Sequence, residues 1–150
     1  MERPYVIENN KERERLIKLV DKITDKELKL VIYKEGWTIA VALAHLAFWD
    51  ERRRVMLKIW KQKGVANSPY IEDIVNDTLI PLLLLIPPRK AAELAVLTAA
   101  TLDEELEELP PEMIKAIEAL KEPYALNRGI HRKMHLDEID VLLKARRGKK

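Results

Sequence analysis

The sequence predicts an all-α protein, a bundle of four principal helices with two or three shorter helices in the connections. Apolar residues recur at helical spacing along the chain, and no stretch alternates between apolar and polar residues for long enough to propose a sheet. Hydrophobic residues make up 47% of the chain but aromatic residues only 5%, which favours helices over sheets. A length of 150 residues fits one domain with a sizeable core, which we expect to span residues 1–150.

The first part of the chain carries two signals for helix starts. Asn9 or Asn10 can cap a first helix. Its apolar stripe consists of Leu16, Leu19, Val20 and Ile23. The sequence from Thr24 to Glu27 then has the pattern of a capping box, which predicts a short helix ending near Gly36.

A long second principal helix follows. Thr38 is placed to cap a helix that runs from Ile39 to about Gln62, and Gly64 is placed to end it. The first half of this segment is apolar on all sides, whereas its second half is amphipathic. We therefore expect the first half to lie at the centre of the bundle.

Prolines divide the remaining chain. Ser68 and Pro69 can start a short helix, and the prolines at positions 81, 87 and 88 should break or kink the apolar stretch between them. Three further helices are expected at about residues 88–109, 112–121 and 124–146.

Charge and composition exclude several classes of function. The net charge is +2, with 27 basic and 25 acidic side chains, so no strong field points to nucleic acid or to an anionic membrane. The basic end at residues 144–150 fits a solvated helix terminus better than a nucleic-acid contact. The apolar run at residues 79–88 is about half the length needed to cross a bilayer. The N-terminal residues lack the apolar stretch of a signal peptide, which predicts a cytoplasmic protein.

The three histidines are the candidates for chemistry. His131 and His135 lie one helical turn apart on an arc that also carries Ile139 and Glu138, while His45 is the ionisable residue of an otherwise apolar segment. Two imidazoles one turn apart can chelate a divalent ion, and a third can reach it from a neighbouring helix. Because the chain has no cysteine, any metal site must use histidine, carboxylate and water. The alternative, histidines that are hydrogen-bonded core residues, stays open on spacing alone.

Known histidine motifs with other functions do not fit. Zinc proteases need a glutamate directly after the first histidine of the pair, where this chain has Arg132. Di-iron bundles of the ferritin type need a glutamate three residues before the histidine, and these positions are Ala42, Arg128 and Arg132.

The residues around the histidines resemble those of the DinB/YfiT-like metal-dependent hydrolases. The matching stretches are residues 36–50 and 131–139, in the same order and at similar distance. The resemblance implies a mononuclear divalent metal held by His45, His131 and His135, with zinc or nickel as first candidates and manganese or iron as further ones. It also implies a homodimer.

The same resemblance implies two reactions, hydrolysis or transfer of a low-molecular-weight thiol to a small-molecule electrophile. In either reaction the metal lowers the pKa of water or of a thiol. The alternative is a non-catalytic bundle that keeps the metal for stability or for binding a small ligand.

Several neighbouring residues allow two interpretations. Glu138 is the candidate catalytic residue, either as a water-activating base or as an acceptor that orients an imidazole, although a role as a salt-bridge partner is favoured over both. Asp50 and Glu51 are expected to pair with Arg53 or Arg54. The tryptophans at positions 37 and 49 are expected in the core, where one of them could form a wall of the substrate pocket.

Overall fold

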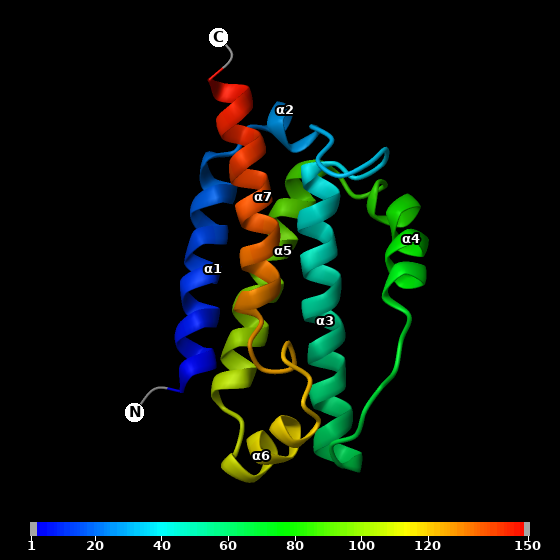
Figure 1. The fold of residues 1–150 in the computed structure, drawn as a ribbon, viewed down its shortest axis with the longest axis vertical. Coiled ribbons are helices and arrows are strands. Elements are labelled where there is room, and N and C mark those ends of the chain that lie inside the picture. The colour runs from blue at the N-terminus through cyan, green and yellow to red at the C-terminus, as the bar shows by residue number, and fades with distance from the viewer. Residues whose placement is uncertain (1–2, 149–150) are drawn as a thin grey trace.

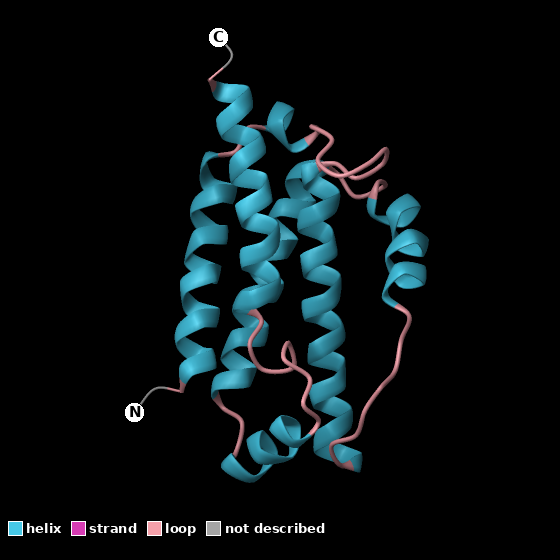
Figure 2. Cartoon of the chain, viewed as in Figure 1, coloured by secondary structure: helices cyan, strands magenta, loops and turns pink. Residues whose placement is uncertain are grey.

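The computed structural model describes residues 3–148 and confirms the all-α fold (Figure 1). Four long helices lie side by side as a bundle, and within residues 3–148 no strand is present, only one isolated bridge between Val31 and Thr38 (Figure 2). The four principal helices are α1 (Pro4–Lys22), α3 (Ile39–Lys63), α5 (Pro88–Glu107) and α7 (Gly129–Arg147).

Three shorter helices occupy the connections. They are α2 (Asp25–Leu28), α4 (Glu72–Leu83) and α6 (Pro111–Ala119). Helix α4 lies on the outside of α3, and α6 crosses the end of the bundle at which α3 and α5 are joined to their following segments (Figure 1).

Helices α2 and α3 start where the sequence predicts, because Thr24 and Thr38 cap them with side-chain hydrogen bonds. The hydroxyl of Thr24 accepts a hydrogen bond from the backbone N–H of Glu27, whose carboxylate accepts one from the Thr24 N–H, so the capping box is complete. The hydroxyl of Thr38 likewise accepts from the Val41 N–H at 3.1 Å. Gly64 ends α3 with a φ of 93°, a conformation that a side chain would oppose.

The first helix begins earlier than predicted, and Asn9, one of its two predicted caps, lies inside the helix instead. Helix α1 starts at Pro4, because proline suits the first helical position. Asn9 is buried within the helix, and its side-chain oxygen accepts from the backbone N–H groups of Arg128 and Gly129 at 2.7 and 2.9 Å. Asn9 therefore accepts hydrogen bonds from backbone N–H groups at the start of α7 that have no partner within the helix. Helix α7 begins at Gly129 rather than near Tyr124.

Two other boundaries differ from the prediction. Helix α2 ends at Leu28, well before Gly36, so the chain reaches α3 through a loop. Helix α4 begins at Glu72 rather than at Ser68, and Pro81 lies inside it, close enough to its end that one missing backbone hydrogen bond is tolerated.

Helix α3 lies at the centre of the core, as its apolar first half predicts. All residues from Ile39 to Ala47 are buried, and α3 packs chiefly against α5. The buried face of α5 carries small residues, which allow the two backbones to approach closely. They are Ala91, Ala92, Ala95 and Ala99.

A buried ionic network links all four principal helices. The guanidinium of Arg132 on α7 donates to both carboxylate oxygens of Asp103 on α5 at 2.8 Å, and to Asp50 on α3 at 3.2 Å. Arg13 on α1 contacts Asp103 at 2.7 Å, and Arg128 contacts Asp50 at 3.0 Å. Each carboxylate thus has two cationic partners.

We expect Asp103→Ala to lower the free energy of unfolding by about 3–5 kcal/mol, because it leaves the buried Arg132 cation short of its bidentate partner. The matched control is Asp140→Ala, which removes an exposed partner of Arg15 and should cost at most about 1 kcal/mol. Urea denaturation of metal-free protein measures both values, and equal losses in the two variants would contradict the assignment.

Candidate metal centre

The structure brings together the three histidines that the sequence singles out. His45 comes from the apolar half of α3, and His131 and His135 come from the first turns of α7. The Nε2 atom of His131 lies 3.1 Å from Nε2 of His45 and 3.1 Å from Nε2 of His135. The possible ligand atoms of all three lie within 4.8 Å of one another, so the residues are positioned to bind one metal ion.

Protons alone do not satisfy this arrangement. A neutral ring nitrogen either donates one hydrogen bond or accepts one, so His131 Nε2 can be hydrogen-bonded to only one of its two equally close neighbours. A shared metal ion accounts for both short nitrogen–nitrogen distances, because two nitrogens that bind one ion at about 2.1 Å lie roughly 3.0–3.4 Å apart. The chemistry of the donor set therefore fits a divalent ion.

Burial keeps the three imidazoles in the neutral form that metal ligation requires. It lowers the pKa of His45 to about 3 and that of His135 to about 4 from the ordinary value of 6.5. The pKa of His131 is lowered to about 2, first by burial and then by the other histidines and the charges of Arg128 and Arg132.

Tyr33 is a residue of the site that sequence reasoning missed. It lies in the loop before α3, and its hydroxyl oxygen is 2.5 Å from Nδ1 of His135, the ring nitrogen that faces away from the cluster. Its ring also meets those of Trp37 and His135 edge to face. No spacing rule selects a loop tyrosine for this contact, since only the tertiary fold brings it to α7.

Glu138, the candidate catalytic carboxylate, is not part of the histidine cluster and lies near Tyr33 instead. Its side chain is exposed and lies close enough to the hydroxyl of Tyr33 to shift the pKa of that hydroxyl. Burial, followed by the negative charge of Glu138, raises the pKa of Tyr33, so its hydroxyl stays protonated. Glu138 therefore acts on the tyrosine that contacts His135, and no hydrogen bond to His135 itself is seen within residues 3–148.

The acidic residues after His45 have different roles from one another. Glu51 pairs with Arg54 at 2.9 Å, as predicted. The prediction for Asp50 is wrong, because its partners are Arg128 and Arg132 of α7. The error has a physical cause: a buried carboxylate must pair with cations that are buried next to it in the fold, even when they are far away in the sequence.

Both tryptophans are buried, and one also borders a cavity. Trp37 and Trp49 are 7% and 8% exposed, and Trp37 meets the ring of His45 edge to face with centroids 5.1 Å apart. Trp49 forms one wall of a cavity of about 200 Å³ that reaches His131. The indole N–H of Trp49 donates to Asn76 at 3.0 Å, which holds this wall in place.

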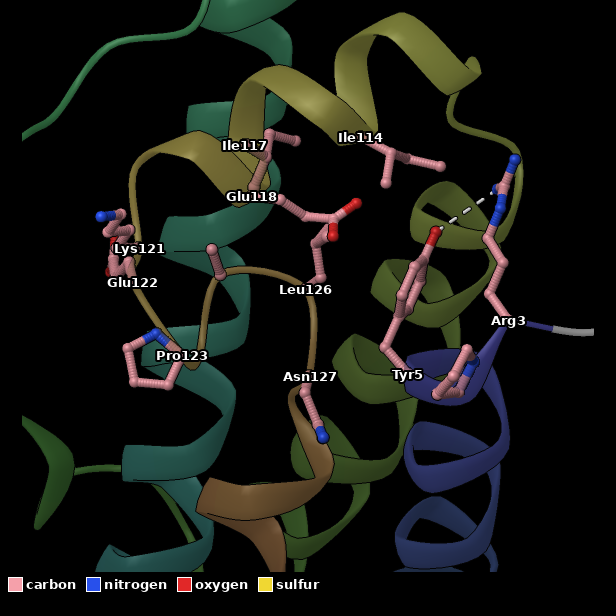
Figure 3. Close-up of a pocket in the computed structure, with 12 residues that line it drawn as sticks. Arg3, Tyr5, Ile114, Ile117, Glu118, Lys121, Glu122, Pro123, Leu126 and Asn127 are labelled. Carbon is pink, nitrogen blue, oxygen red and sulfur yellow. Dashed lines mark hydrogen bonds between the residues drawn. The ribbon is translucent and has the colours of Figure 1, made fainter.

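A larger cavity of about 680 Å³ lies apart from the histidines, between the start of α1, helix α6 and the segment that precedes α7 (Figure 3). Ile114 and Ile117 of α6 form its apolar side opposite Tyr5, and the carboxylate of Glu118 extends between them (Figure 3). Its border carries no member of the histidine cluster.

Comparison with protein families decides the assignment of the chain. The model of the DinB superfamily matches residues 8–142, a range that includes all four principal helices in most of their length and all three histidines. The chain belongs to the DinB superfamily. Comparison with curated proteins finds no match, and comparison with solved structures finds none either. In this DinB superfamily member, no helix within residues 3–148 is both long and apolar enough to cross a membrane.

The histidine cluster predicts a pH-dependent stability of the metal-free protein. Its histidines have folded pKa values below their unfolded value of about 6.5, so the unfolded chain binds more protons as the pH falls. The free energy of unfolding should therefore drop below about pH 6.5, by up to about 1.4 kcal/mol per pH unit for each buried histidine. Urea denaturation across this range measures the slope, which should be shallower in His135→Gln. An unchanged slope in that variant would contradict the prediction.

Proposed function

We propose that this DinB superfamily protein holds one divalent metal ion with His45, His131 and His135 and acts as a metal-dependent hydrolase or thiol S-transferase. The observation that carries the proposal is the pair of 3.1 Å contacts at His131 Nε2, which hydrogen bonding cannot satisfy together. Zinc and nickel are the first candidates, since both bind imidazole well, and manganese or iron are further ones.

Three neutral protein ligands fit a reactive centre better than a purely structural one, because structural zinc sites are normally closed by four protein ligands. When bound, the ion supplies Lewis-acid chemistry that makes hydroxide or thiolate available near neutral pH. The chain has no cysteine, so a thiol substrate comes from outside.

The protein's own residues hold the imidazoles in position. If His135 binds metal through Nε2, its Nδ1 carries the proton and donates a hydrogen bond to the Tyr33 oxygen, and the nearby charge of Glu138 favours the protonated form of Tyr33. This hydrogen bond fixes both the tautomer and the rotation of the His135 ring. Trp37 packs against His45 and keeps water from that side of the centre.

The first experiment measures bound metal in protein purified without a histidine tag. Wild type should carry about one equivalent, and His45→Ala should lose most of it, because the remaining pair comes from a single helix. Lys133→Ala is the control, since this exposed residue lies between His131 and His135 in the sequence but pairs with Asp137. A wild type that stays free of metal after incubation with zinc, nickel or manganese would contradict the proposal.

Activity then separates an enzyme from the alternative, a bundle that keeps the ion for stability or ligand binding. Turnover of esters, amides or thiol plus electrophile that is lost in a folded His135→Ala variant supports the enzyme. Metal-dependent melting without turnover supports the alternative.

A second prediction concerns Tyr33. Tyr33→Phe removes only the hydroxyl that contacts His135, and it should weaken metal affinity by about 10–100-fold. Competition with a chelator of known affinity measures the change. Tyr70→Phe is the control, because Tyr70 stacks on Arg52 rather than contacting a histidine. Equal affinity in Tyr33→Phe and wild type would show that the hydroxyl does not support the ligand.

A further inference from the structure

The cavity beside His131 combines aromatic walls with an unusual concentration of guanidinium groups. It lies between α3, the segment before α4 and the start of α7, and its volume of about 200 Å³ is below the range of drug-sized ligand pockets. Trp49, Tyr70 and Met134 give it apolar surface. Its charged border consists of Arg52, Arg53, Arg128, Glu72 and Glu122.

Arg52 is held in place without a carboxylate partner. Its guanidinium donates to the backbone oxygen and the hydroxyl of Ser68 at 3.0 and 3.1 Å, and it lies over the ring of Tyr70 at 4.5 Å. Both neighbours are neutral, and within residues 3–148 Arg52 forms no ion pair. The side chain is therefore oriented while its charge is uncompensated.

The two deeper arginines are only partly compensated. Arg53 has a side chain that is 4% exposed, pairs with Glu122 at 2.9 Å and leaves its buried Nε without a hydrogen-bond partner. Arg128 pairs with Asp50, but Asp50 also serves Arg132. Burial lowers the pKa of Arg53, and the like charge of Arg128 lowers it further.

The charge balance around the cavity leaves one excess positive charge. Five arginines belong to the cavity border and the network behind it: Arg13, Arg52, Arg53, Arg128 and Arg132. Four carboxylates accompany them: Asp50, Glu72, Asp103 and Glu122. A single negative charge would neutralise this excess, and a planar carboxylate matches the guanidinium fork.

We propose that this cavity binds a small organic carboxylate as a monoanion, with the carboxylate on Arg52 and the apolar part against Trp49 and Tyr70. The remaining end of the ligand faces His131. The inference rests on the proposed function in one respect, since it names the substrate class of the same centre. Recognition of the anion itself, however, depends on the arginines and is measurable without metal.

The test titrates benzoate, and separately its neutral analogue benzamide and inorganic phosphate, into protein stripped of metal and into protein loaded with nickel. Isothermal titration calorimetry gives the affinity of each ligand. The shift of the Trp49 indole N–H signal in NMR spectra shows whether the ligand binds in this cavity. We expect saturable benzoate binding in both forms and at least tenfold weaker binding of benzamide. Arg52→Gln should weaken benzoate binding about tenfold or more, through loss of a charged hydrogen bond.

Lys58→Gln is the matched control, because it removes the same charge from an exposed position of α3 outside the cavity. It should bind benzoate as wild type does. Equal binding of benzamide, unchanged binding in Arg52→Gln, tighter binding of phosphate or no saturable binding to the metal-free protein would each overturn the proposal. Metal content, measured on the same samples, reports separately on the histidine centre.

Discussion

The buried contact of Arg132 with Asp103 and Asp50 is the constraint on which the site depends. Arg132 is 1% exposed and directly follows His131 in the sequence, so its position fixes the rotation of α7 about its axis. Asp103 comes from α5 and Asp50 from α3, and a bidentate pair tolerates little rotation. With α7 fixed in this way, His131 and His135 are turned towards the face of α3 that carries His45.

The same network shapes the electrostatics of the centre. Buried cations are costly unless they are paired, and here each aspartate is shared between two arginines. Such sharing leaves residual positive potential next to His131, which helps to keep its imidazole neutral. A neutral imidazole presents a lone pair, so an arrangement that holds the helices together also favours metal ligation over protonation.

Local signals in the sequence were sufficient for much of the fold. The capping residues Thr24 and Thr38 act on backbone groups within three residues of themselves, and both predictions are confirmed. Asn9 has the same capping chemistry but satisfies α7 rather than its own helix, which no reading of neighbouring residues could reveal. The approach of the three histidines followed from helical spacing and from the resemblance, whereas the contact of Tyr33 depends on a loop whose path is set by tertiary packing.

Successive side chains at the start of α7 face three different surroundings: the histidine cluster, the buried ionic network and solvent. Along His131, Arg132 and His135 the side chains alternate between the histidine cluster and the ionic network, while Lys133 points to solvent and pairs with Asp137. A helix offers this division because successive residues lie 100° apart. Arg132 therefore acts together with the buried Leu136, Ile139 and Leu143 of the same helix in setting its rotation, and with it the direction of both imidazoles. The arginine that excludes the zinc-protease motif thus also contributes to positioning the histidines on either side of it.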